Sequence, residues 1–242
     1  PSSTHSFGRK SKAILETSRR SIAKHINANP SEIIFTSGGT EADNIAINSA
    51  VSSMGVNRII TTSLEHHAVG HTASAAAKQF GVQVEIVDVD NKGNVDLNKL
   101  ETMLQTNVKT IVSLMHANNE IATLLPLKKV SALCRKYNAL FHSDTVQTMG
   151  HYQFDMQDLD IDYVTCSAHK IHGPKGIGFL YVNNKVRVEP LIHGGSQERG
   201  FRGGTENIYG IVGLAKAMDL AHEDLEGHQK HIQGLKTHLI NE

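Results

Sequence analysis

Residues 32–54 read EIIFTSGGTEADNIAINSAVSSM, and this stretch decides the fold class. EIIFT is a short apolar run that ends at small residues, as buried strands do. In TEADNIAINSAVSSM, Ile45, Ile47 and Val51 with the alanines between them suit the buried face of a helix. A strand that leads directly into a helix is the repeating unit of α/β domains.

The same alternation continues along the chain. Further strands are predicted in NRIITT, VQVEIVDV, VKTIVSLM and ALFHSD, and helices near 68–80, from about Asp96 and near 126–137. Residues 207–240 are mainly helical and polar in pattern. We therefore expect one α/β domain with a mostly parallel sheet, in which ligands bind beyond the carboxyl ends of the strands.

The charge balance argues against several classes of partner. The 24 lysines and arginines cancel the 24 acidic residues, and no basic run predicts binding to nucleic acid or to an anionic membrane. No apolar run has the length of a membrane span, and the first ten residues lack the apolar core of a signal peptide. Two cysteines, Cys134 and Cys166, make no disulfide framework. These features predict a cytoplasmic protein that binds a small molecule or another protein.

The turn SGGTE follows the first predicted strand. Gly38 and Gly39 let the backbone approach a ligand, and Thr40 opens the helix. Bare N–H groups at a helix start can hold a phosphate, although this turn lacks the lysine of a P-loop. Two interpretations therefore stay open for the turn, an anion site or a tight turn with a helix cap.

Three histidines, His66, His67 and His71, follow the next predicted strand in EHHAVGH. His67 and His71 have the spacing of metal ligands, but Glu65 is the one carboxylate nearby and no cysteine completes a cage, so we predict no metal site. A better use for one histidine is a flat ring against a planar ligand. The NNE sequence at 118–120 adds amide and carboxylate groups that orient a ligand.

Asp144 and Lys170 end two later strands, and Gln147 follows Asp144 by one turn. A buried carboxylate is costly unless paired, so Asp144 either makes a structural salt bridge or cap, or faces a cation such as a protonated pyridine nitrogen. Lys170 is either a surface or phosphate-binding cation, or a nucleophile that forms a Schiff base with an aldehyde. Together with the SGGTE turn and a stacking histidine, these residues match the needs of pyridoxal phosphate.

Seven motifs occur in order: PSSTHSFGR, FTSGGTEADN, EHHAV, HANNEI, FHSDTVQ, SAHKIHGPKGIG and HGGSQERGFRGGTEN. With them the whole chain resembles the cysteine desulfurases, pyridoxal-phosphate enzymes related to class V aminotransferases, in the branch with the housekeeping and nitrogen-fixation enzymes. The resemblance implies the large domain of an aspartate-aminotransferase-like, fold type I transferase with a seven-stranded sheet between helices. It implies a core over about 1–210 and a helix at 211–240 leading towards a small domain absent from this chain, as is the opening strand upstream of PSS.

The resemblance also assigns residue roles. Lys170 would be the Schiff-base lysine, Asp144 the partner of the pyridine nitrogen and His66 the ring stacked on the cofactor. Asn119 and Gln147 would lie towards the phenolic oxygen, with Asn119 also facing the substrate carboxylate. The implied phosphate contacts are Gly39, Thr40, Ser167 and His169. Thr205 would reach the phosphate of the neighbouring subunit, which implies a homodimer.

The family converts L-cysteine to alanine and passes sulfur to an enzyme cysteine as a persulfide, for iron–sulfur cluster assembly or tRNA thiolation through an acceptor such as an iron–sulfur scaffold. That cysteine lies beyond RGGTEN in the family, whereas Cys134 and Cys166 have the patterns of packed core residues. We expect this chain to bind the cofactor without completing persulfide formation. A selenocysteine lyase, a class V aminotransferase and a non-enzymatic scaffold or docking module are the alternatives.

Overall fold

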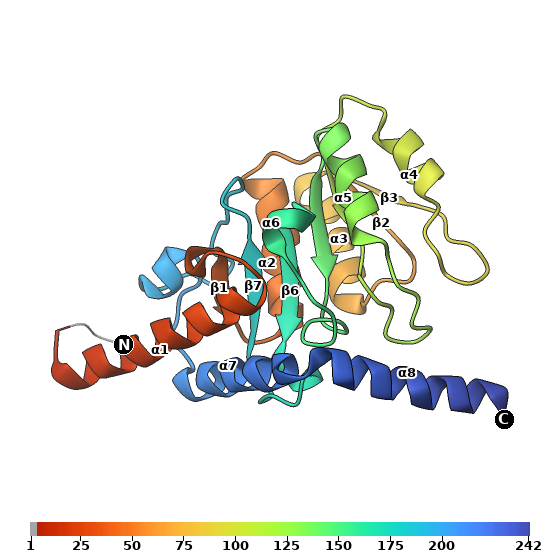
Figure 1. Cartoon of the computed structure of the whole chain (residues 1–242). Coiled ribbons are helices and arrows are strands. Elements are labelled where there is room, and N and C mark those ends of the chain that lie inside the picture. The colour runs from red at the N-terminus through yellow and green to blue at the C-terminus, as the bar shows by residue number, and fades with distance from the viewer. Residues whose placement is uncertain (1–3) are drawn as a thin grey trace.

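Seven short strands form one sheet in the order β1-β7-β6-β5-β4-β2-β3 (Figure 1). The structure is a computed structural model that describes residues 4–242. The strands are β1 (Ile33–Thr36), β2 (Arg58–Thr61), β3 (Gln83–Ile86), β4 (Thr110–Ser113), β5 (Leu140–Asp144), β6 (Tyr163–Ser167) and β7 (Gly178–Val182). Neighbours from β3 to β6 pair in parallel, and β7 is antiparallel to both β1 and β6. The predicted mostly parallel, seven-stranded sheet is confirmed.

Helices cover both faces of this sheet. They are α1 (Ser6–His25), α2 (Gly39–Ser52), α3 (His67–Phe80), α4 (Leu97–Leu104), α5 (Leu127–Lys136), α6 (Met156–Leu159), α7 (Ile208–Glu223) and α8 (Leu225–Asn241). Apolar residues of α2 and α3 pack in one core cluster, while those of α1, α4, α5, α6 and α7 pack in the other. The predicted helices at 40–54, 68–80 and 126–137 lie within two residues of the observed bounds.

Alternation along the strands explains the two cores. In β1, Ile33 and Phe35 belong to one cluster and Ile34 to the other. Successive strand side chains point to opposite faces, so a strand covered on both faces is apolar at every position. Continuous apolar runs such as EIIF are the sequence consequence of this burial.

The C-terminal stretch, expected as one helix over 211–240, is two helices that meet at Asp224. The α7 helix contacts α1 and buries Leu214 and Met218 in the core, so it belongs to the main body. By contrast, α8 has no buried residue and extends away from the sheet (Figure 1). The Asp224 side chain accepts a hydrogen bond from Gly227 N and so caps α8, which explains the break.

A tight β6–β7 connection places Lys170. After β6 the chain makes a 3₁₀ turn at Ala168–Lys170, and β7 returns antiparallel with Ser167 opposite Gly178. In Figure 1 the β6 arrow points towards α7 and α8, so the carboxyl edge of the sheet lies on that side. Within residues 4–242, no helix is both long and apolar enough to cross a membrane.

Candidate functional site

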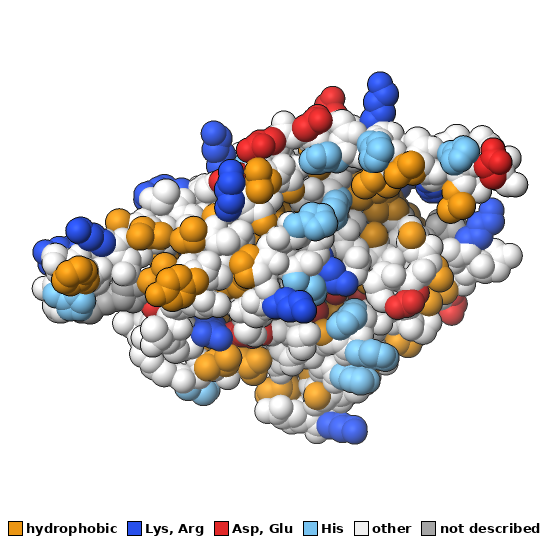
Figure 2. Space-filling view, turned by 90° about the horizontal axis from the view of Figure 1, so that it is seen from below, with side chains coloured by type: hydrophobic (Ala, Val, Ile, Leu, Met, Phe, Trp, Pro, Cys, Tyr) orange, Lys and Arg blue, Asp and Glu red, His pale blue; other side chains and the backbone are white. Residues whose placement is uncertain are grey.

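The polar residues predicted after the strands collect at the carboxyl edge of the sheet. Figure 2 views the molecule from that side and shows histidine side chains among scattered charged groups. Parallel strands end at the same edge, which is why residues from distant parts of the sequence meet there.

Asp144 and His66 come together at the centre of this edge. Asp144, the last residue of β5, is 5% exposed, and its Oδ1 accepts a hydrogen bond from Val146 N. His66 is the exposed N-cap of α3, where its Nδ1 accepts from Ala68 N at 3.1 Å. One ligand-type atom each from Asp144, His66 and Asp43 lie within 4.8 Å of one another. Burial, with a further contribution from the Asp43 charge, raises the pKa of Asp144 to about 7.

Behind Asp144 lies a buried polar group that the sequence analysis did not identify. Asp43 of α2 is 1% exposed, and its Oδ1 lies 3.4 Å from Nε2 of His142. The other ring nitrogen, Nδ1, is 2.8 Å from Ser113 Oγ. Burial raises the pKa of Asp43 to about 7 and lowers that of His142 to about 4. A signal was present: His142 and Asp144 share one face of β5, and Asp43 is a carboxylate on the apolar side of a helix.

The SGGTE turn lies against the end of β6. Gly38 has φ of +154°, a conformation open to glycine, and it leaves α2 without a side-chain cap. A Cβ on Gly39 would lie 2.7 Å from Val146 Cγ2 and 3.8 Å from Ser167 Cβ. The buried Ser167 hydroxyl is 2.9 Å from Nδ1 of His169. Uncapped helix N–H groups, a hydroxyl and an imidazole therefore gather at one place, as an anion requires.

Lys170 is exposed at the end of the 3₁₀ turn that follows β6. Its main-chain carbonyl accepts from Nε2 of His151 at 3.2 Å, when that nitrogen carries the proton. The main chain at Lys170 is thus hydrogen-bonded to His151, while the residue itself is exposed.

Three further predicted residues are less closely tied to this cluster. Asn119 is exposed and donates to Glu120 at 2.7 Å, while its neighbour Asn118 holds the loop by donating to Leu64 O at 2.6 Å. Gln147 is half-buried in the turn after Asp144. Thr205 lines a cavity of about 140 Å³ together with Thr36 and Ser37, at the start of the SGGTE turn.

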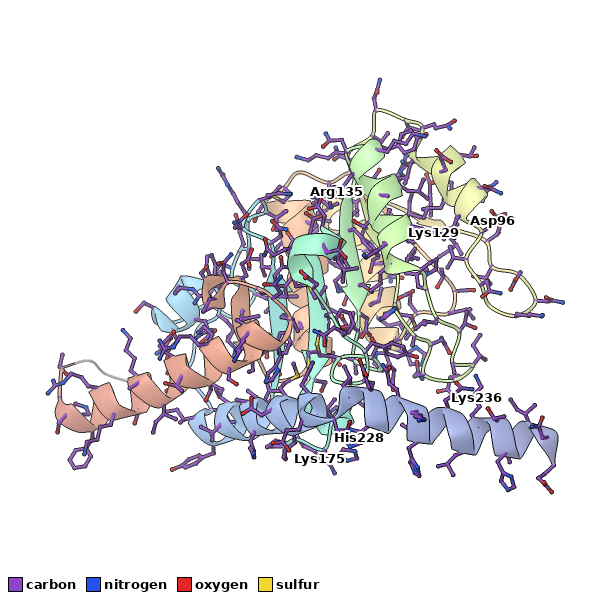
Figure 3. The ribbon with its side chains drawn as sticks, in the orientation of Figure 1. Asp96, Lys129, Arg135, Lys175, His228 and Lys236 are labelled. Carbon is purple, nitrogen blue, oxygen red and sulfur yellow. The ribbon has the colours of Figure 1, made fainter. Side chains whose placement is uncertain are left out.

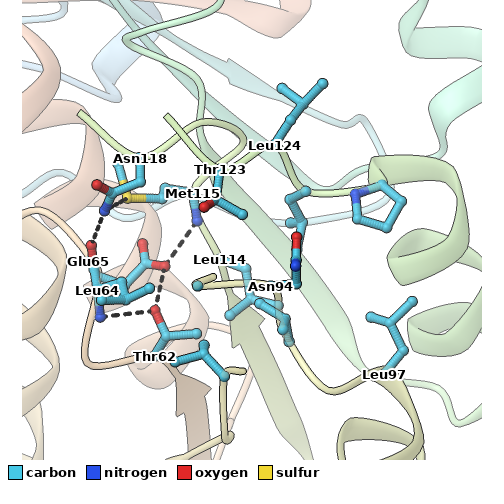
Figure 4. Close-up of a pocket in the computed structure, with 15 residues that line it drawn as sticks. Thr62, Leu64, Glu65, Asn94, Leu97, Leu114, Met115, Asn118, Thr123 and Leu124 are labelled. Atoms are coloured by element: carbon cyan, nitrogen blue, oxygen red, sulfur yellow. Dashed lines mark hydrogen bonds between the residues drawn. The ribbon is translucent and has the colours of Figure 1, made fainter. Parts of the chain in front are cut away.

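A second cavity, of about 330 Å³, lies among the segments that follow β2, β3 and β4 (Figure 4). One wall is Glu65, whose Oε1 accepts from Met115 N at 2.9 Å and Thr62 Oγ1 at 3.2 Å (Figure 4). Burial raises the pKa of Glu65 to about 8, so its carboxyl group is largely protonated at neutral pH. Glu65 and Asn118 fix the loop that carries His66 to the loop that carries Asn119.

Among residues 4–242, the remaining ligand-type side chains do not converge on a metal site. His67 and His71 stack with ring centroids 5.1 Å apart. Over residues 4–242, the group of three side chains with converging ligand atoms is Asp43, His66 and Asp144.

Both cysteines are buried in the core, as the sequence predicted. Burial raises the pKa of Cys134 to about 12 and raises the pKa of Cys166 still further. A nucleophilic cysteine reacts as an accessible thiolate, so neither thiol has the required environment.

Comparison with known proteins agrees with this geometry. Residues 1–242 match the family model described as aminotransferase class V. A cysteine desulfurase IscS from Clostridium botulinum is 45% identical over 242 residues, and a cysteine desulfurase from Bradyrhizobium diazoefficiens is 45% identical over 241. These alignments cover 99% and 98% of this chain but 60% and 61% of the relatives, so the chain spans about three fifths of their length.

Solved structures show the same fold. A NifS-like protein superposes with a TM-score of 0.94 at 41% identity, covering 99% of this chain and 66% of that protein. A structure described as SspA in complex with cysteine has a TM-score of 0.83 at 34% identity, covering 90% of this chain and 64% of that one. The chain therefore belongs to the class V aminotransferase family, whose cysteine desulfurase members depend on pyridoxal phosphate.

Proposed function

We propose that this chain is the cofactor-binding part of a pyridoxal-phosphate-dependent cysteine desulfurase acting on L-cysteine. The observation that carries the proposal is the meeting of buried Asp144 with His66 at the same sheet edge as the uncapped start of α2. The likeness to proteins named cysteine desulfurase and to a structure described with cysteine supports the choice of substrate.

The residues present fit pyridoxal phosphate at both ends. A buried carboxyl group with a raised pKa suits a cationic ring nitrogen, and bare helix N–H groups beside Ser167 suit a phosphate. Val146 links the two ends, since it follows Asp144 and packs against Gly39. The distance from Asp144, the proposed partner of the ring nitrogen, to the turn proposed to bind the phosphate is therefore set by directly packed residues.

When bound, pyridoxal phosphate supplies an aldehyde and an electron-withdrawing ring that acidifies the α-carbon of an amino acid. Asp144 would keep the ring nitrogen protonated, and His66 would pack on the ring. Lys170 would hold the aldehyde covalently and, once displaced by L-cysteine, move the α-proton. The proposed phosphate partners are Gly39, Thr40, Ser167 and His169. Asn119 and Gln147 would bind the phenolic side of the ring, with Asn119 also binding the substrate carboxylate.

Sulfur transfer needs a thiol other than Cys134 and Cys166, because both are buried. In this proposal these 242 residues bind the cofactor but form no persulfide, and the complete protein passes sulfur to an acceptor such as an iron–sulfur scaffold protein. In this proposal Thr205 reaches the phosphate of the neighbouring subunit in a homodimer.

The first test is covalent capture of the cofactor. With pyridoxal phosphate the protein should turn yellow, and borohydride should fix the cofactor on Lys170, as located by peptide mass spectrometry. Lys170→Ala should abolish the attachment. Lys175→Ala, which removes an exposed lysine five residues away (Figure 3), should leave it intact.

A colourless protein without a borohydride adduct would contradict cofactor binding and favour a scaffold or docking role. Assays of the complete protein with L-cysteine, selenocysteine and amino-acid/keto-acid pairs separate a desulfurase from a selenocysteine lyase or an aminotransferase. Persulfide formed on these 242 residues alone would contradict the assignment of the sulfur-accepting thiol.

A further inference from the structure

Asp43 is a second buried carboxyl group beside the one proposed to bind the ring nitrogen. It comes from α2, on the layer opposite α7, and is 1% exposed. Its Oδ1 is buried without a hydrogen-bond partner in the described part of the chain, and it lies 3.4 Å from Nε2 of His142. An unpaired carboxyl oxygen at such a site is costly, so its presence calls for a physical role.

Two carboxyl groups this close cannot both ionise without a neighbouring cation. Asp43, Asp144 and His66 have ligand-type atoms within 4.8 Å of one another, and burial lowers the pKa of His142 so that it stays neutral. The two carboxyl groups of such a pair titrate together, so their pKa values describe the pair and not either residue alone. The titratable groups that face it from the packed elements are Glu65 and His66 at the start of α3, His142 in β5 and Cys166 in β6.

We propose that Asp43 is a positioning residue for the cofactor, which sets the charge that Asp144 presents to the ring nitrogen. The inference rests on the proposed function, because it assumes that pyridoxal phosphate is the ligand. Before binding, Asp43 and Asp144 share a proton. With a pyridinium bound, Asp144 would accept its N–H as a carboxylate, and the proton shared by Asp43 and Asp144 would leave to solvent.

His142 and Thr165 support this pair. The Thr165 hydroxyl lies 3.2 Å from Nε2 of His142 and favours the charged form of Asp43. Ser113 Oγ contacts the other imidazole nitrogen and can donate to it, which leaves the Nε2–H for Thr165 Oγ1, with Asp43 Oδ1 3.4 Å from the same nitrogen. Three adjacent elements, β4, β5 and β6, thus hold one carboxyl group of α2 in place.

Asp43→Asn tests the proposal, because it removes the charge and keeps the shape. Dissociation constants for pyridoxal phosphate, measured by equilibrium dialysis between pH 5.5 and 8.5, should show wild-type affinity rising with pH through the neutral range. In Asp43→Asn the midpoint of this rise should move down by about one pH unit, since one of two repelling carboxylates is gone. The analogue with carbon in place of the ring nitrogen should show no such rise in either protein.

Asp162→Asn is the matched control. Asp162 is equally buried, but it lies at the amino end of β6, paired with Arg135 of α5, whose position at the other end of the sheet is labelled in Figure 3. Its removal should leave the midpoint unchanged. Asp43→Ser, which lacks the charge but keeps a hydroxyl, should repeat the shift seen with Asp43→Asn.

An Asp43→Asn midpoint equal to that of wild type would overturn the inference. So would loss of the folded state in both Asp43 variants by circular dichroism, because Asp43 would then be structural. If the wild-type protein binds no pyridoxal phosphate, the proposed function itself fails, so the two failures are distinguishable.

Discussion

A close contact between backbone segments, rather than a side chain, shapes the SGGTE turn that is proposed to bind the phosphate. A Cβ on Gly178 would lie 2.3 Å from the carbonyl oxygen of Cys166 and 2.9 Å from Cα of Gly38. The first residue of β7 therefore has to be glycine for the turn at Gly38 to lie against the sheet. The motif GPKGIG therefore shapes the proposed phosphate site through its backbone, because Gly178 is its last residue.

We expect Gly178→Ala to destabilise the protein by about 1–3 kcal/mol, the usual range for overpacking, and to weaken pyridoxal phosphate binding at the displaced turn. Urea unfolding and equilibrium dialysis measure the two effects. Gly70→Ala is the control, because a Cβ there meets no atom within 4 Å and a helical alanine is favoured over glycine. Equal stability of the Gly178 variant and wild type would contradict the contact.

Among single residues, the sequence predicts the candidate site residues at the ends of strands, but it does not identify the buried residues that contact them. Asp144 and Lys170 were identifiable because each follows an apolar run that ends at the carboxyl edge. Asp43 was missed, although it lies one turn before the buried Ile47 on the apolar side of α2. Which helix face packs on β5 is a tertiary property that a single sequence does not state.

Among the elements, α1 is joined to β1 and to the loop before α7 by a buried ion pair. Arg19 Nη1 donates to Ile33 O at 2.7 Å and pairs with Glu198 Oε2 at 2.8 Å. The same Glu198 oxygen accepts from Phe35 N, while Glu198 and Arg199 both adopt left-handed backbone conformations. Strained backbone conformations persist where the surrounding interactions fix them. Here the hydrogen bonds of the Glu198 side chain to Arg19 and Phe35 fix this segment.

Removing only Glu198 should be more harmful than removing the pair. We expect Glu198→Leu to cost about 3–5 kcal/mol, because Arg19 is left buried and unpaired. The double variant Arg19→Met/Glu198→Leu should recover a large part of that loss. A double-mutant cycle in urea measures the coupling, and strictly additive effects would show that Arg19 and Glu198 are not energetically coupled.

The bounds of helices and strands could be predicted from the sequence where the hydrophobic pattern agrees with the packing in the structure. The apolar strands and the Ala-rich helix α3 were predicted closely, since burial on both faces of the sheet leaves a clear pattern. The break at Asp224 was missed, because a polar helical stretch gives little sign of which half packs on the body. The left-handed residues before α7 also lack a sequence signal, being held by a distant arginine.

For the whole molecule, the buried carboxyl groups make stability depend on pH. Asp43, Asp144 and Glu65 have folded-state pKa values raised to about 7, 7 and 8. Their stabilising contribution is complete below the unfolded-state pKa and declines as pH rises through those values. His116 and His142 have pKa values lowered to about 4, so their contribution to the unfolding free energy increases with pH. This increase occurs below about pH 6.5, where the unfolded chain binds protons that the folded chain does not.

The cofactor-free protein should therefore lose unfolding free energy between pH 6.5 and 8, by about 1 kcal/mol for each buried carboxyl group. Asp43→Asn and Glu65→Gln should each reduce the loss, whereas Glu226→Gln, on the exposed α8, should not. Urea unfolding at both pH values measures the effect. Wild-type pH dependence in the Asp43 variant would show that Asp43 does not titrate in this range.

The short β6–β7 hairpin has a consequence for the speed of any reaction at Lys170. Lys170 lies three residues after the end of β6, and the hydrogen bond from His151 to its main-chain carbonyl restrains its backbone. Movement of the amine then requires rotation about side-chain bonds, which occurs in picoseconds to nanoseconds, rather than loop opening in microseconds or longer. Proton transfer by Lys170 would be limited by chemistry and ligand exchange, not by the main chain that carries it.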